Sequence, residues 1–215
     1  MLNVNLDLNI TDYVTVDFNS IIECVDLLGG VDMEITDDEA SLMTGYIREL
    51  NELTGNKAEN LTQGGTYTLN GVQACAYARI RYGGGDDYRR TERQRTVLTA
   101  MVKKAQQSDL TTVNKLINEV CGDIQTSFSN AELLALASQV FQYSIGDTTG
   151  FPFTKTTKVL SKKTGDVVIP CDLSDNVKEL HIFLYEDSAY TASDTVKQTS
   201  EKIVSDTGFK SGDGH

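Results

Sequence analysis

The sequence lacks the features that mark several common protein classes. It has no tryptophan and two prolines, and apolar runs such as LLALA at 133–137 fall short of the roughly 20 residues that a membrane-spanning helix needs. The amino-terminal stretch MLNVNLDLNI has neither a basic start nor a small-residue cleavage site, so we expect no secretory signal in this chain. With 40% hydrophobic and 23% charged residues, the composition favours a folded soluble protein over a disordered or fibrous one.

Metal-binding and redox motifs are also absent. The four cysteines are far apart and form no C-x-x-C pair, and the two histidines, His181 and His215, are too few for a histidine cluster, so we expect no metal site within the chain. His181 shares a helical face with apolar residues and is interpreted as a core or boundary histidine. The cysteines are interpreted as buried thiols, although disulfides in an extracellular setting remain open. They are Cys24, Cys75, Cys121 and Cys171.

The chain is acidic, but its arginines are concentrated in one place. The net charge is −12, which argues against general binding to nucleic acid or anionic membranes. Six of the seven arginines lie between residues 79 and 95, against three acidic residues, so this stretch carries +3 and the rest of the chain −15. We call residues 79–95 the arginine segment. Its local surplus of positive charge predicts a site for an anion.

Strand and helix patterns alternate early in the sequence, and this favours an α/β fold. At 215 residues we expect one domain over 1–208 and a flexible tail over 209–215. The loop at 55–69 is rich in Gly, Asn and Thr and could reach over a pocket. The patterns predict strands at 12–18, 31–35 and within 149–169. They predict a helix that begins at a cap on Asn19 or Ser20, and further helices at about 37–54, 70–80, 88–107, 110–122, 129–143, 175–187 and 193–204.

Two neighbouring helices carry the arginine segment. In the first helix, Val72, Cys75 and Arg79 recur on one face, so an apolar stripe ends in an arginine. In the second, the stripe is polar for two turns and apolar afterwards: it contains Arg90, Gln94, Val97 and Met101, with Arg93 beside it. Stripe position therefore predicts that Arg79, Arg90 and Gln94 point inward.

Buried guanidinium groups need partners, because an unpaired buried charge is costly. Asp86, Asp87 and Glu92 are too few for six arginines, so the surplus favours an external anion. Arginine suits phosphate oxygens because its planar fork donates two parallel hydrogen bonds, and the amino terminus of the second helix adds a positive dipole end. Asp87 could cap that helix and hold Arg90, whereas Arg89 and Arg95 fit a solvated face.

Known phosphate-binding motifs do not explain the glycines at 83–85. GGGDD lacks the Gly-Lys-Ser/Thr ending of a P-loop and does not follow a strand, as a Rossmann motif does. No serine or cysteine lies in a recognisable nucleophile setting. These competing motifs therefore fail on spacing.

The sequence resembles the LytR-CpsA-Psr family, which attaches glycopolymers to the bacterial cell wall. The resemblance runs through VTVDFNSIIECVDLLGGVDMEI, LNGVQACAYARIRY and DDYRRTERQRTVLTAMVKK, and covers at least residues 10–108. It implies a three-layer α-β-α sandwich with a mixed central sheet, and leaves open that the N-terminal strands are incomplete. It also implies transfer of a glycosyl phosphate, such as teichoic acid or capsule, from an undecaprenyl-pyrophosphate carrier to peptidoglycan, at the extracellular face of the membrane in Gram-positive bacteria.

The resemblance also implies the site residues. Those of the polyprenyl-pyrophosphate site correspond to Arg79, Arg81, Asp87, Arg90 and Gln94, with Arg93 adjacent, and Val97 and Met101 would line the way to a lipid pocket. Arg89 stands where the family usually has Gly. The family domain begins upstream with a membrane helix and strands that carry Mg²⁺-binding aspartates, so we expect a truncated chain whose Mg²⁺ ligands lie upstream.

Three functions remain open from the sequence. The first is the cell-wall phosphotransferase, or a carboxy-terminal fragment of it that is inactive without the metal. The second is a non-catalytic module that binds polyprenyl phosphates or wall polymer. The third, a nucleic-acid binder, is disfavoured because the remaining −15 would repel a polyanion. The polymer, the acceptor and the oligomeric state are not determined by the sequence.

Overall fold

The chain folds into two compact units of helices and short strands. A computed structural model describes residues 1–81, 87–120, 124–162 and 164–214, together with the backbone but not the side chains of residues 87, 110, 117 and 120. The central unit comprises the described residues between 12 and 148, and the terminal unit comprises residues 1–11 and the described residues from 149 onward. The expectation of one domain over 1–208 stays a prediction.

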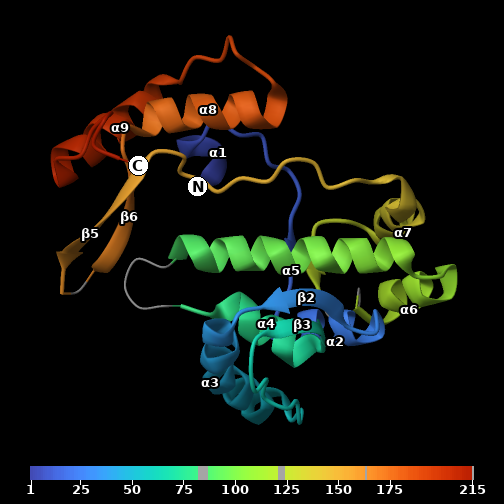
Figure 1. Ribbon diagram of the computed structural model, residues 1–215. Helices are drawn as coiled ribbons and strands as arrows, with labels where there is room; N and C mark the ends of the chain where they lie inside the picture. Colours follow the sequence, from blue (N-terminus) through green and yellow to red (C-terminus); the bar gives the residue numbers. More distant parts are fainter. Residues whose placement is uncertain (82–86, 121–123, 163, 215) are drawn as a thin grey trace. The chain divides into compact units, whose positions relative to one another are not determined.

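The central unit contains most of the helices (Figure 1). Its helices are α2 (Phe18–Leu27), α3 (Asp37–Thr54), α4 (Gly71–Arg79), α5 (Asp87–Gln107), α6 (Leu110–Val120), α7 (Asn130–Ser138) and the 3₁₀ helix η1 (Val140–Gln142). Its strands are β1 (Val14–Thr15), β2 (Val31–Ile35), β3 (Gly65–Leu69) and β4 (Gln125–Thr126). The predicted helices of this unit are confirmed, except that α7 and the 3₁₀ helix η1 replace the single helix expected at 129–143. Residues 121 and 122 of the helix expected at 110–122 lie outside the described residues, and α3 has the predicted bounds.

Three expectations about the first seventy residues need correction. Only Val14–Thr15 of the strand expected at 12–18 pairs with another strand, because Asp17 instead caps α2 by accepting a hydrogen bond from the Ser20 amide at 2.8 Å. The cap is therefore Asp17 rather than Asn19 or Ser20. Residues 65–69 of the expected loop form β3, whose pairing with β2 at Met33 and Tyr67 is a long-range contact that local composition does not reveal.

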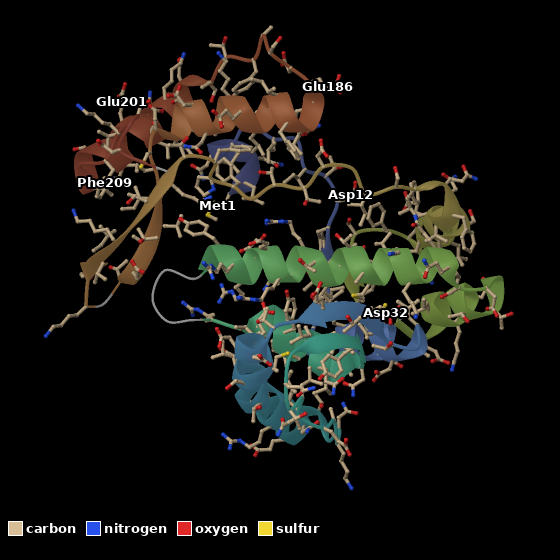
Figure 2. All side chains as sticks on the ribbon, viewed as in Figure 1. Met1, Asp12, Asp32, Glu186, Glu201 and Phe209 are labelled. Carbon is tan, nitrogen blue, oxygen red and sulfur yellow. The ribbon has the colours of Figure 1, made fainter. Side chains whose placement is uncertain are left out.

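The β2–β3 ladder alternates buried and exposed residues. The side chains of Val31, Met33 and Ile35 are buried, whereas Asp32 between them is exposed and accepts a hydrogen bond from Thr68 at 2.6 Å. Lys104 of α5 pairs with Asp32 at 3.5 Å, and Figure 2 labels Asp32 below the ribbon of α5. The buried face of the ladder therefore belongs to the core, and α5 contacts β2.

Helix α4 is the centre of the unit, because it packs against α2, α3 and α5. It is buried on nearly every side, which its small residues, in the run GVQACAYAR, allow. At Gly71 the backbone of α4 approaches α2 so closely that a Cβ would lie 2.2 Å from the Ile22 carbonyl oxygen. The amide of Gly71 also donates to Asp26 at 2.7 Å. This close approach fixes α2 and α4 side by side.

The terminal unit pairs a hairpin with two helices. Its elements are α1 (Leu2–Asn5), β5 (Lys155–Ser161), β6 (Gly165–Pro170), α8 (Leu173–Tyr185) and α9 (Asp194–Thr207). The prediction for His181 is confirmed: it is buried, its Nε2 lies 3.0 Å from the Leu6 carbonyl oxygen, and its ring stacks on Tyr190 at 3.7 Å between centroids. In the tail, Ser211 donates to Asp175 at 3.2 Å.

The described strands form three two-stranded antiparallel sheets: β1–β4, β2–β3 and β5–β6. The mixture of helices and strands agrees with the α/β expectation, although the strands in the described ranges do not join into one central sheet. Cys75 and Cys171 are buried thiols, as expected, whereas Cys24 is only half-buried and Cys121 lies outside the described residues. Within the described chain, no helix is both long enough and apolar enough to cross a membrane.

Candidate functional site: an apolar cavity ending at Arg79

The main candidate site is a cavity of about 460 Å³ in the central unit. Its walls come from the segment that leads into α2, from the last two turns of α4 and from the middle of α5. Such a cavity suits a hydrocarbon chain, because apolar walls gain from excluding water and a few polar groups orient the ligand. The lining residues are Val16, Asp17, Phe18, Ile21, Cys75, Ala78, Arg79, Gln94, Val97, Leu98 and Met101.

Among the residues that the structure describes, Arg79 is the only cation that lines this cavity. Its Nη2 atom pairs with Glu49 of α3 at 3.0 Å, and its guanidinium carbon lies 4.9 Å from the Phe18 ring centroid and 5.3 Å from that of Tyr46. Its Nη1 atom is buried and has no hydrogen-bond partner within the described chain. A buried donor without a partner is costly, so an anion oxygen supplied by a ligand would satisfy it.

Two titratable groups beside Arg79 show the local electrostatics. Burial raises the pKa of the Cys75 thiol to about 12, although the nearby Arg79 charge acts to lower it. The pKa of Asp17 is lowered, chiefly by the hydrogen bond from the Ser20 amide and then by that from the Ser20 hydroxyl. Cys75 is therefore an inert apolar wall rather than a nucleophile, and Asp17 is an ionised helix cap.

The structure brings four of the sequence-predicted residues to this cavity: Arg79, Gln94, Val97 and Met101. Val97 and Met101 are buried, as a lipid-lining role requires, whereas Gln94 is largely exposed. The expectation that Gln94 points inward therefore needs correction: it lines the cavity but does not belong to the buried face of α5.

The other predicted residues have different surroundings. Arg81 is exposed just after α4, and Arg90 is half-buried near the start of α5. The side chain of Asp87, predicted to cap α5 and hold Arg90, lies outside the described residues. Arg95, expected on a solvated face, lines a different hollow of the surface together with Lys103.

Arg93 is the buried arginine of α5, with 7% of its surface exposed. It lines a second, polar pocket of about 370 Å³ and pairs through Nε with Glu39 at 3.2 Å, while its Nη1 atom donates to the Ile80 carbonyl oxygen at 3.3 Å. The inward face of α5 therefore runs through Arg93, Val97 and Met101. The sequence did not reveal this, because Glu39 is 54 residues away along the chain.

Sequence reasoning also missed the group that surrounds Arg79. The strand pattern at 12–18 includes Phe18, but Phe18 begins α2 and its ring lies against the guanidinium of Arg79. Tyr46 and Glu49 lie three residues apart on α3 and reach the same guanidinium. Their spacing is a visible signal that they share a helix face. Periodicity alone does not say which other helix that face meets.

The Mg²⁺ implied by the resemblance finds no site among the residues that the structure describes. No three His, Cys, Asp or Glu side chains in those ranges come together to hold a metal ion. Around Arg79 the acidic groups serve other purposes, since Asp17 caps α2 and Glu49 pairs with the guanidinium. The described residues therefore do not fit this metal, and no step of the chemistry is derived through it.

Comparison with known proteins decides the family. The model of the LytR_cpsA_psr family matches residues 1–161, three quarters of the chain. The chain belongs to the LytR_cpsA_psr family. This membership agrees with the resemblance carried by the arginine segment.

Two relatives of this LytR_cpsA_psr chain are named as teichoic acid transferases. It is 28% identical over 133 residues to the polyisoprenyl-teichoic acid--peptidoglycan teichoic acid transferase TagV of Bacillus subtilis, a match over 61% of this chain and 32% of that protein. It is 30% identical over 123 residues to the transferase TagU of Halalkalibacterium halodurans, over 56% of this chain and 36% of that protein. The matches span about a third of each relative.

The fold is also that of the family. The crystal structure of B. subtilis TagV matches 89% of this chain and 69% of its own, with a TM-score of 0.63 and 22% sequence identity. At this identity the likeness shows the fold alone, and it confirms the predicted fold class.

Proposed function

We propose that this chain acts in attaching a glycopolymer to peptidoglycan, and that its cavity binds the polyprenyl part of a lipid-linked diphosphate donor. The observation that carries the proposal is an apolar cavity in whose described wall Arg79 is the single cation, with an unsatisfied donor on that cation. A polyprenyl diphosphate has this pair of chemistries, a long hydrocarbon joined to an anion. The names of the relatives TagV and TagU support the same substrate class, because both names mention polyisoprenyl and teichoic acid.

In this proposal the cavity wall binds the hydrocarbon of the donor, and polar residues of the arginine segment bind its diphosphate. Val97 and Met101 contact the hydrocarbon, because both are buried in the cavity wall. Arg79 donates to the diphosphate, with Gln94 beside it at the cavity. Arg81, Arg90 and the carboxylate of Asp87 complete the set that the resemblance assigns to the diphosphate. Phosphoryl transfer depends largely on positioning and on neutralising developing charge, which arginines supply.

The proposed reaction transfers the sugar-bearing phosphate. An acceptor hydroxyl oxygen of peptidoglycan forms a bond to the phosphorus that carries the glycan, and the P–O bond to the lipid phosphate breaks. Polyprenyl phosphate leaves, and the hydroxyl proton is released. Such a donor lies in the membrane, so we place the reaction at the extracellular face of the cytoplasmic membrane.

A second function, binding without turnover, is favoured by one observation. Among the described residues, no three His, Cys, Asp or Glu side chains come together that could hold Mg²⁺. To separate the two functions, the protein is mixed with Mg²⁺, a lipid-linked glycopolymer donor and peptidoglycan, and released polyprenyl phosphate is measured. Release shows turnover; binding of the donor without release shows a binding module.

The binding proposal is tested by titration calorimetry with geranylgeranyl diphosphate. Arg79→Ala removes charge-assisted hydrogen bonds of about 1.5–3 kcal/mol, so we expect affinity to fall roughly 10- to 100-fold. Arg95→Ala is the matched control, because Arg95 belongs to the same segment but lines a different hollow. An equal loss in both variants, or no binding by the wild type, overturns the proposed function.

A further inference from the structure

Arg93 has contacts unlike those of Arg79, although both belong to the arginine segment. Arg79 lines the apolar cavity, whereas Arg93 is 7% exposed and contacts protein groups of two other elements: the Glu39 carboxylate of α3 at 3.2 Å and the Ile80 carbonyl oxygen at the end of α4 at 3.3 Å. One guanidinium thus connects α3, α4 and α5. The planar fork of arginine makes this possible, because separate nitrogens donate in fixed directions.

Both oxygen atoms of the Glu39 carboxylate accept hydrogen bonds in this arrangement. Its Oε2 atom accepts hydrogen bonds from the amide of Thr36 at 3.1 Å and from the Thr36 hydroxyl at 3.0 Å, which complete the capping box of α3. Its Oε1 atom accepts from Arg93. The helix cap fixes the carboxylate, and the carboxylate in turn fixes the guanidinium. Arg93 is therefore held in place from a rigid helix start.

The contact with Ile80 acts on the residue next to Arg79. Ile80 follows α4 as its C-cap, and its backbone has already left the helical region, at φ −53° and ψ 132°. The last carbonyl groups of a helix lack donors within the helix, and Arg93 supplies a donor to the carbonyl of this fully buried residue. The end of α4, and with it the backbone of Arg79, is thereby tied to α5, which carries Gln94.

We propose that Arg93 is a positioning residue rather than a phosphate ligand: through Glu39 and Ile80 it sets where Arg79 stands relative to Gln94. The proposal rests on the proposed function for its consequence in binding, but not for the structural link itself. It revises the role of Arg93 expected from its place in the arginine segment.

Glu39→Gln distinguishes a positioning role of Arg93 from a ligand role, because the two roles predict changes of opposite sign in diphosphate affinity. Glutamine retains the capping-box geometry of α3 but weakens the hold on Arg93. If Arg93 were a ligand, Glu39→Gln would release it and raise the affinity for geranylgeranyl diphosphate. If Arg93 positions Arg79, affinity falls by about tenfold, because small displacements of a binding group are costly. Affinity for geranylgeraniol, which has no phosphate, stays unchanged.

Two further variants make the comparison quantitative. Arg93→Lys retains the positive charge but not the fork, so a positioning role predicts a loss close to that of Arg93→Gln, whereas a ligand role predicts near-normal binding. Glu92→Gln is the matched control, because Glu92 lines the same polar pocket and is exposed. Removing its charge should leave the affinity unchanged or raise it slightly.

A measurement without ligand separates this proposal from the proposed function. Amide hydrogen exchange of residues 77–81 should accelerate in Glu39→Gln, while the amides of α2 stay protected, because only the end of α4 loses its tie. If the wild type binds neither probe, the proposed function fails and the exchange result still decides the role of Arg93. Unchanged exchange at 77–81, or tighter diphosphate binding by Glu39→Gln, overturns the positioning role.

Discussion

Replacing Gly71 with alanine should destabilise the protein by an amount that the structure allows to be estimated. The added Cβ would lie 2.2 Å from the Ile22 carbonyl oxygen and 2.5 Å from its Cα, and both are backbone atoms that cannot rotate away. Helices α2 and α4 would have to separate by about 1 Å, and overpacking of this kind costs about 3 kcal/mol. The reduced entropy of the unfolded chain offsets about 0.5–1 kcal/mol, which leaves a net loss of about 2 kcal/mol.

The control is Gly45, a second helical glycine with open space where its Cβ would lie. Gly45 is exposed in α3, and a Cβ there would meet nothing within 4 Å. Gly45→Ala should therefore stabilise the protein by up to about 1 kcal/mol through helix propensity. The two variants are predicted to shift stability in opposite directions.

Urea unfolding followed by circular dichroism measures both variants. For a chain of this size, the loss in Gly71→Ala corresponds to a decrease in Tm of roughly 4–8 °C. Since Ile21 and Cys75 line the cavity on either side of this contact, the variant should also bind geranylgeranyl diphosphate more weakly. The reasoning is refuted if Gly71→Ala proves as stable as the wild type, since the close approach of α2 and α4 would then not exist.

Three further predictions concern the cavity and the titratable groups. Ala78 lines the cavity, so Ala78→Phe should fill part of its volume and lower the affinity for geranylgeranyl diphosphate about tenfold, while inorganic pyrophosphate binds as before. A loss of affinity for both probes would contradict the cavity assignment. Because burial raises the pKa of Cys75 to about 12, this thiol should resist iodoacetamide at pH 8 in the native protein and react on unfolding, as mapped by mass spectrometry; rapid native labelling would show that it is not buried. Burial acts to raise the pKa of Asp7, but hydrogen bonds from Tyr190 and Ser193 outweigh burial, and the pKa is lowered. The stability that Asp7 adds relative to Asp7→Asn is therefore present above the unfolded-state pKa near 3.8. It is lost as the pH falls through the lower pKa of the folded state. Urea midpoints of both proteins at pH 7 and pH 3 test this, and an equal difference at the two pH values would be the contrary result.

Much of the helical structure could be predicted because its signals are local. The acidic turn at residues 37–39 predicted where α3 begins, and the turn residues between elements marked most other helix ends. The strands were harder to predict, because the paired residues of β2 and β3 are thirty or more positions apart and Asp17 fits either a strand pattern or a helix cap. Pairing of strands depends on partners that a window of sequence does not contain.

Part of the candidate site could also be predicted from local sequence signals. Arg79, Gln94, Val97 and Met101 were selected by spacing on two helices, and the structure places all four at one cavity. The partners of Arg79 were not visible, since Phe18 and Glu49 come from other helices. A stripe shows which residues share a face but not what that face meets.

The sequence by itself determined that six arginines stand together in an acidic chain, on two helices whose apolar faces end in polar residues, and it identified the family. Only the tertiary structure decided that Arg93 is the buried arginine of α5 and that Arg79 lines the apolar cavity. The physical reason is that a guanidinium can be buried only where a carboxylate or carbonyl oxygen meets it. For Arg93 that oxygen belongs to Glu39, which only the folded chain brings within 3.2 Å.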